Sequence, residues 1–170
     1  MGYTPYETSV LVCKDALKSL RHILEVAEKQ PNSSTLPKAR LHEDMQPLYF
    51  QVGAISITIA KLVGRLSGTQ PVLFGYLGLE TFADMFKRID SVDELLNKAD
   101  KDLINSRIDE TIPVPTESGG TAQLAGDGQV FGFSLPNLFF HVSTAYGILR
   151  KEGVPLGKSD YIDSFSGRWA

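Results

Sequence analysis

Apolar residues recur every three or four positions along most of the chain, a spacing that predicts amphipathic helices. The clearest example covers residues 134–152, where Leu138 and Leu149 lie on one stripe. Ser134 is a good helix-capping residue, and Pro136 suits a first turn, where its missing N–H costs nothing. We therefore expect a helix that begins at Ser134.

The same spacing occurs in three earlier segments, and each should form a further helix of the same domain. In the last of them, Ser91 and Glu94 have the spacing of a capping box, so a break near Asp90 is one interpretation and a continuous helix is the other. The three predicted helices cover residues 6–30, 42–66 and 80–106.

Two segments lack this helical spacing. Residues 108–133 are rich in Gly and Pro and contain two β-like runs, residues 111–115 and 129–133, so a β-hairpin that turns at Asp127 and Gly128 is expected there. The tail, residues 153–170, should lie over the helices through its apolar side chains. These are Val154, Leu156, Tyr161 and Phe165.

Together these elements predict an all-α fold, an antiparallel four-helix bundle that forms one domain over residues 1–170. Residues 108–133 would be an insertion before the last helix, and residues 153–170 a C-terminal tail. Sites in such bundles usually lie between facing helices.

Composition narrows the function classes. A chain of 170 residues with 42% hydrophobic and 22% charged residues suits one globular domain, and a net charge of −3 argues against a nucleic-acid surface. No secretory signal and no apolar run long enough for a membrane span is visible, so a cytoplasmic protein is the default. The single cysteine, Cys13, excludes an internal disulfide and is expected to be a buried, inert thiol.

His141 is the strongest candidate for chemistry, because it falls on the inner stripe of the 134–152 helix. A histidine there is either a hydrogen-bonded core residue or part of a site. Asp44 and Gln51 are seven residues apart and should share one side of the 42–66 helix, although Asp44 fits a helix cap equally well. Either side chain could fix the His141 tautomer, and Tyr146 would reach the edge of the same pocket.

Two segments resemble a known family. Residues 41–51, LHEDMQPLYFQ, and residues 135–150, LPNLFFHVSTAYGILR, together with GVPLGKSDY at residues 153–161, are similar to a family of fungal and bacterial proteins of unknown function in the DinB/YfiT-like superfamily. The resemblance covers the whole chain in length and order. It implies the four-helix bundle, commonly as a homodimer.

The resemblance also implies that a divalent metal could bind. Better-known superfamily members use three histidines for a divalent metal, two of them four residues apart on the last helix. His141 matches the first of that pair, but Ala145 stands at the second position. His42 is the remaining imidazole of the pattern. A ligand set would then consist of His42, Asp44 and His141, with Glu80 as a further candidate.

Three functions follow as hypotheses. The first is a metal-free enzyme of the isomerase, dehydratase or cyclase type that acts on a small molecule through His141, Asp44, Gln51 and Tyr146. The second, implied by the resemblance, is a metal-dependent thiol transferase or hydrolase with His42 and His141 as ligands. The third is a non-catalytic ligand-binding or structural protein. No cofactor-binding motif is present: Gly157, Lys158 and Ser159 imitate a Walker motif, but Glu152 stands where its first glycine is required.

Overall fold

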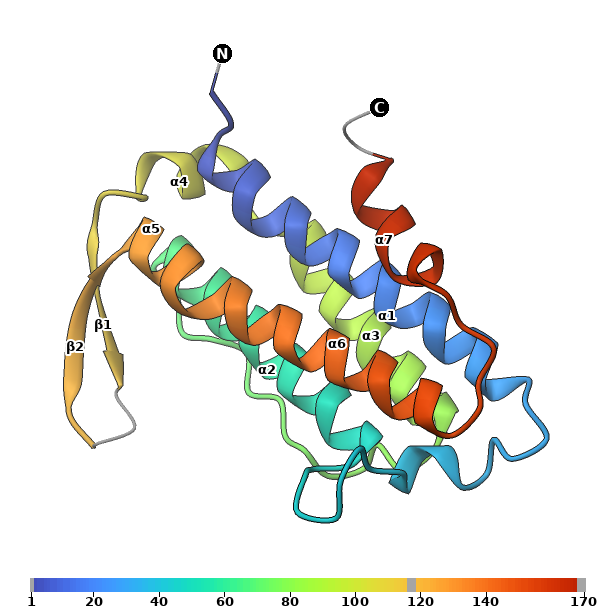
Figure 1. Ribbon diagram of the computed structural model, residues 1–170. Helices are drawn as coiled ribbons and strands as arrows, with labels where there is room; N and C mark the ends of the chain where they lie inside the picture. Colours follow the sequence, from blue (N-terminus) through green and yellow to red (C-terminus); the bar gives the residue numbers. More distant parts are fainter. Residues whose placement is uncertain (1, 116–118, 168–170) are drawn as a thin grey trace.

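The computed structural model describes residues 2–115 and 119–167 and is mostly helical (Figure 1). Its longest helices lie side by side: α1 contacts α3 and α6, and α2 contacts the same two helices from the other side. Each of them therefore has two neighbours, and the space they enclose is the core. The bounds are α1 Val12–Glu28, α2 Leu48–Ser67, α3 Phe82–Asn97 and α6 Leu135–Lys151.

The core is built from the apolar stripe of each long helix. Leu20, Ile55, Ile89 and Leu138, one from each, are at most 2% exposed. Burial of one such side chain is worth about 1.5–3 kcal/mol, so the four stripes together fix which face of each helix points inward. A short π-helix, η1 (Glu7–Leu11), precedes α1, and a 3-10 turn, η2 (Leu36–Lys38), follows it.

Helix α2 begins later than the sequence suggested. Its first residue is Leu48, Pro47 is the extended N-cap residue, and residues 40–46 form a loop without regular helix. A proline disfavours helical backbone in the residue before it, so the helix cannot extend back through Gln46 to His42. The predicted start at residue 42 is therefore wrong, and Asp44 does not lie on α2.

The third predicted helix is divided, but not near Asp90. Helix α3 ends at Asn97, and a short helix, α4 (Lys101–Ser106), follows after three residues. Asp100 caps α4 by accepting a hydrogen bond from the Leu103 N–H at 3.0 Å. Ser91 lies inside α3 and donates to the Lys87 carbonyl, so its apparent capping box is not used.

The connection between α2 and α3 crosses α2 at its glycines. A Cβ on Gly64 would lie 2.9 Å from backbone atoms of Pro71, and a Cβ on Gly53 would lie 3.1 Å from the Tyr76 ring. Because glycine has no Cβ, the connection can lie directly on the helix. This close approach places Tyr76 beside the first turns of α2.

The segment before α6 contains the expected hairpin with a different second strand. Strands β1 (Thr111–Pro115) and β2 (Thr121–Ala125) pair antiparallel, with Pro113 opposite Gln123. Asp127 and Gly128 follow the second strand and lie in a short helix, α5 (Gly126–Gln129). The predicted strand at residues 129–133 and the predicted turn at residues 127 and 128 are therefore wrong.

Helix α6 continues without interruption from what precedes it (Figure 1). Helix α5 leads into a π-helical turn, η3 (Val130–Ser134), and then into α6. A proline within a helix lacks one N–H and crowds the carbonyl four residues earlier, and the wider π turn before Pro136 relieves both problems. Ser134 is helical and makes no capping hydrogen bond, so its predicted role as a cap is wrong.

The tail contains one more helix, α7 (Lys158–Ser166), which packs against α1. Val154 and Leu156 are buried as expected, and the Ser19 hydroxyl on α1 donates to the Tyr161 carbonyl at 2.9 Å. His22 lies 2.8 Å from Asp160. The pKa of Asp160 lies below its ordinary value because its carboxylate accepts hydrogen bonds from the Gly157 N–H and from His22.

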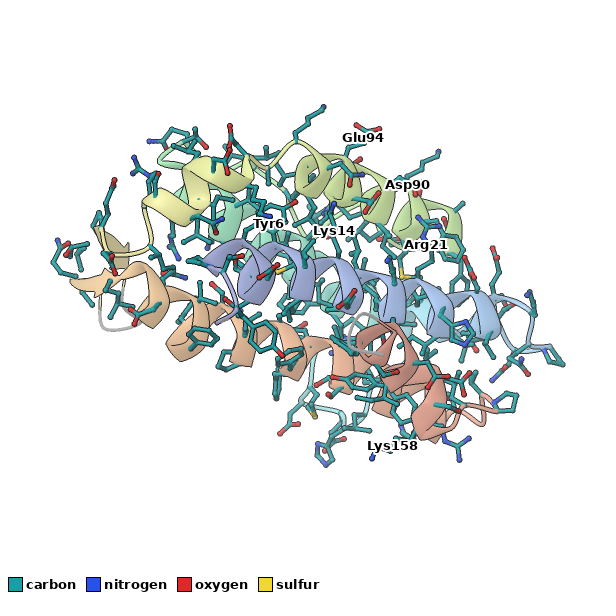
Figure 2. All side chains as sticks on the ribbon, turned by 90° about the horizontal axis from the view of Figure 1, so that it is seen from above. Tyr6, Lys14, Arg21, Asp90, Glu94 and Lys158 are labelled. Atoms are coloured by element: carbon teal, nitrogen blue, oxygen red, sulfur yellow. The ribbon has the colours of Figure 1, made fainter. Side chains whose placement is uncertain are left out.

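On the opposite side, α1 is linked to α3 by polar contacts near the surface (Figure 2). Arg21 pairs with Asp90, and the Lys14 ammonium donates to the Asn97 side-chain oxygen at 2.7 Å. Exposed pairs of this kind contribute little stability, so the buried stripes and not these contacts hold the two helices together. Within residues 2–115 and 119–167, no helix is long and apolar enough to cross a membrane.

Candidate functional site

The structure brings Gln51 on α2 and His141 on α6 together. His141 Nδ1 lies 2.7 Å from Gln51 Oε1, and the Gln51 side chain is 2% exposed. The Gln51 Nε2 group donates to the carbonyls of Gln46 and Pro47, at 2.9 and 3.4 Å. Carbonyls only accept, so the Gln51 oxygen must face the imidazole, and Nδ1 must carry the proton that the imidazole donates.

This arrangement defines the state of the imidazole. With Nδ1–H donating to Gln51, the neutral ring carries its lone pair on Nε2. Burial lowers the pKa of His141 below its ordinary value, so the neutral form prevails at neutral pH. Among the described residues, no hydrogen bond occupies Nε2, and this atom is free to accept a proton.

His141 lines a cavity of about 450 Å³ between α2 and α6. The Phe50 and Tyr76 rings stack at one side with a centroid separation of 4.4 Å, and the π turn before α6 supplies Phe133 and Ser134. The volume is in the range of pockets for small organic ligands. The remaining lining residues are Ala54, Ile57, Thr58, Lys61, Arg65, Gly132 and Asn137.

Further polar side chains cross from α2 to the α6 side along the cavity. Asn137 donates from its amide nitrogen to the Thr58 hydroxyl at 2.8 Å. Arg65 donates to the Gln129 oxygen at 3.0 Å, and the Gln129 amide nitrogen in turn donates to the Ser134 hydroxyl at 2.7 Å. Gln129 is 0% exposed, so it holds the guanidinium from a fixed, buried position.

Three of these cavity residues, Asn137, Lys61 and Arg65, were missed from the sequence. A signal existed: Gln51, Thr58 and Arg65 follow one another at intervals of seven, two helical turns, on the same side of α2. We had expected this series to begin at Asp44, whereas the structure continues it to Arg65. The start of α2 at Leu48 explains the error, because residues before it do not share the helical phase.

His42 and Asp44 contact each other in the exposed loop before α2. His42 Nδ1 lies 2.7 Å from Asp44 Oδ1, and the side chains are 65% and 80% exposed. Neither residue lines the His141 cavity. The expectation that Asp44 shares a helix face with Gln51 is therefore wrong, and Gln51 is the residue that contacts His141.

Tyr146 lies on another side of α6. Its ring packs edge to face on Tyr161 of α7, with a centroid separation of 6.3 Å, and it lines a separate small cavity with Ser143 and Lys158. Tyr146 is absent from the lining of the His141 cavity. The structure thus separates Tyr146 from His141, and the expected shared pocket is not present among the described residues.

The residues implied for a metal do not fit one. Ala145, at the position of the second helix histidine, offers no ligand and is 0% exposed, while His42 is in the exposed loop. The Nδ1 edge of His141 is engaged by Gln51, and Glu80 lies on the surface. In the part of the chain that the structure describes, no three His, Cys, Asp or Glu residues are grouped to hold a metal ion.

Comparison with known proteins places the chain in a family. No curated protein matches it. A crystal structure of a DinB family member protein from Shewanella denitrificans is 30% identical, covers 92% of this chain and 90% of its own, and superposes with a TM-score of 0.83. The model of a domain of unknown function, DUF1993, matches residues 6–162. The chain therefore belongs to the DUF1993 family, with a DinB-like helical fold, as the resemblance implied.

Proposed function

We propose that this protein is an enzyme that moves a proton on a small organic molecule, with His141 as the general base and no metal. The observation that carries the proposal is the Gln51–His141 hydrogen bond of 2.7 Å, which leaves Nε2 unprotonated beside a cavity of about 450 Å³. For the scaffold we propose the antiparallel four-helix bundle.

The chemistry follows from that tautomer. Nε2 takes a proton from a carbon next to a carbonyl, the electron pair of the broken C–H bond moves into the carbonyl system, and the imidazolium returns the proton elsewhere or to a leaving group. Gln51 accepts from Nδ1–H throughout and so keeps the ring in one orientation. Isomerisation, elimination of water and ring closure all need only these steps.

The lowered pKa of His141 supports the role of base. A base must be unprotonated before it reacts, and burial keeps the imidazole neutral at neutral pH. The surrounding rings of Phe50 and Phe140, with centroids 6.4 and 5.3 Å from the imidazole, exclude water from part of its surface.

A non-catalytic ligand-binding protein is the second candidate. The observation that favours it is that the same hydrogen bond can serve a purely structural role. The Gln51 side chain hydrogen-bonds two backbone carbonyls and one imidazole, and so links the start of α2 to α6. Under this alternative, His141→Gln would lower stability and change no reaction.

Proton exchange tests the proposal without knowledge of the true substrate. The purified protein is incubated in D₂O with pooled 2-oxo acids, 3-oxo acids and enoic acids, and deuterium uptake at carbon is followed by mass spectrometry. We expect uptake into at least one compound, reduced at least about a hundredfold by His141→Gln, the lower end of what a general base contributes.

His42→Gln is the matched control, because it removes an imidazole that does not line the cavity. Uptake should be unchanged in that variant. If uptake with His141→Gln equals that of the unmodified protein while the variant remains folded, His141 is not the base and the proposal fails.

A further inference from the structure

The end of the cavity away from the Gln51–His141 pair carries two cationic side chains, which the proposed proton transfer does not require. Lys61 and Arg65 line it from the last turns of α2, and no described lining residue is a carboxylate. Neither cation forms an ion pair within residues 2–115 and 119–167. The described wall of this part of the cavity is therefore positively charged and has no protein anion to balance it.

The neighbouring polar groups are arranged as hydrogen-bond donors. Gln129 fixes one nitrogen of the Arg65 guanidinium and leaves its other N–H groups for a ligand. The Ser134 hydroxyl accepts from Gln129, so its own proton can be donated, and the Thr58 hydroxyl is in the same position because it accepts from Asn137. A ligand with acceptor oxygens and negative charge complements these donors.

The partial burial of Arg65 also favours an anionic ligand. The guanidinium is partly withdrawn from water, which lowers its pKa below the ordinary value. A partly desolvated cation with only a neutral amide partner is costly, and an anionic ligand would remove that cost.

The two ends of the cavity are well separated. Gln51, which holds His141, and Arg65 are fourteen residues apart on α2, which corresponds to about 20 Å along the helix axis at ~1.5 Å per residue. The long side chains of Lys61 and Arg65 shorten the distance that a ligand must span. Between the ends, the lining contains the apolar residues Ala54 and Ile57 and the hydrogen-bonded pair Thr58 and Asn137.

We propose, building on the proposed function, that the substrate is an elongated anion, whose carboxylate or phosphate binds Lys61 and Arg65 while its reacting group lies at His141. The cavity thus selects its substrate by length and by charge. Short anions cannot reach both ends, and neutral molecules of the same length leave the cations without a partner.

Binding of simple probes tests this inference without turnover. Decanoate, decyl phosphate, decanamide and acetate are titrated into the full-length protein by calorimetry at low ionic strength. We expect decanoate or decyl phosphate to bind at least about tenfold more tightly than decanamide, since hydrogen bonds to a charged group are worth more than neutral ones. Acetate should bind at least tenfold more weakly than decanoate.

Variants locate the anion. Lys61→Gln combined with Arg65→Gln should remove the preference of the protein for the anion over decanamide. Arg65 also hydrogen-bonds Gln129, so its replacement could disturb the fold, and Lys61→Gln alone serves as the second variant. Lys61 is exposed, so its replacement should weaken binding of the anion without disturbing the fold. Lys87→Gln, on the exposed side of α3, removes the same charge elsewhere and should leave the preference unchanged.

The result that overturns the inference is equal binding of decanoate and decanamide, no binding of either anion, or an anion preference that survives loss of both Lys61 and Arg65. Its failure is distinguishable from failure of the proposed function. Anion-selective binding without deuterium exchange would leave the anion site standing and remove the general base. Deuterium exchange in a neutral substrate, without preferential binding of anions, would support the general base and remove the anion site.

Discussion

Gln51 and His141 are ninety residues apart in the chain and lie 2.7 Å from each other, with Gln51 almost completely buried. The contact joins α2 to α6, and its geometry allows only one assignment of the imidazole proton, because the Gln51 amide nitrogen faces two carbonyls. The chemical state of His141 is thus decided by a residue on another helix.

Replacement of Gln51 by Met should release that tautomer. Methionine has a similar length but accepts hydrogen bonds only weakly, so Nδ1–H would lose its partner and both neutral tautomers would be populated. Long-range ¹H–¹⁵N NMR spectra of the imidazole report this directly. The unmodified protein should show a proton on Nδ1 alone.

Loss of the buried amide in Gln51→Met should also lower the free energy of unfolding by about 1–3 kcal/mol, because the Gln46 and Pro47 carbonyls lose a donor. Gln46→Met is the control, since only the backbone carbonyl of this exposed residue takes part. An unchanged tautomer in Gln51→Met would show that Gln51 does not fix the ring.

The stability of the protein should depend on pH through His141. Its pKa in the folded protein lies below the unfolded value of about 6.5, so the unfolded chain binds the proton more readily below that pH. The stabilising contribution of the neutral imidazole is fully present above pH 6.5 and is lost as pH falls from there through the folded pKa.

His141→Gln should remove this acid-side contribution. Thermal unfolding midpoints measured from pH 7.5 to pH 5 should fall less steeply for the variant than for the unmodified protein. Parallel slopes for His141→Gln and the unmodified protein would contradict the lowered pKa.

Cys13 should be inert while the protein is folded. It is 1% exposed, and burial raises the pKa of its thiol from 9.0 to about 12, which lowers the thiolate fraction on the order of a thousandfold near neutral pH. Iodoacetamide at pH 8 should leave the native chain unmodified and alkylate it in denaturant, as intact-mass spectrometry would show. Rapid labelling of the native chain would contradict the burial of Cys13.

Two helical glycines should respond in opposite directions to alanine. In Gly147→Ala the new methyl would lie 3.7 Å from the Leu41 side chain, an ordinary contact, so the variant should gain up to about 1 kcal/mol in helix propensity. In Gly64→Ala the methyl would lie 2.9 Å from Pro71 backbone atoms, which must move, and the net effect should be destabilising. Chemical denaturation of both variants measures the difference, and equal shifts would show that the α2–α3 connection does not press on Gly64.

Much of the helical framework could be predicted because it depends on local spacing. The stripes that include Leu20, Ile55 and Leu138 mark the buried faces, and all three residues are 0% exposed. Element ends were predicted less well. Ser134 has the chemistry of a cap, but it belongs to the π turn η3 and its backbone is helical. Helix α2 begins only after Pro47, whereas its start was predicted at residue 42.

The site followed the same division. The sequence identified His141 and Gln51 as residues that face inward, because both lie at inward positions of a helical stripe. It could not show that α5 and the π turn place Gln129 against Arg65 and Ser134 against Gln129. Nor could it show that Tyr146 packs on Tyr161 of α7 and does not line the cavity. Those contacts depend on how helices distant in the chain pack, and helical spacing within one segment carries no information about its neighbour.

The sequence by itself therefore determined the helical class, the family and the inward direction of His141, since periodicity and motif are local properties of the chain. The tertiary structure alone decided which imidazole nitrogen carries the proton and how far His141 lies from the cations of α2. It also decided that His42 lies in an exposed loop and outside the cavity that His141 lines. The physical reason is that hydrogen bonds, burial and cavity shape arise only where two segments meet.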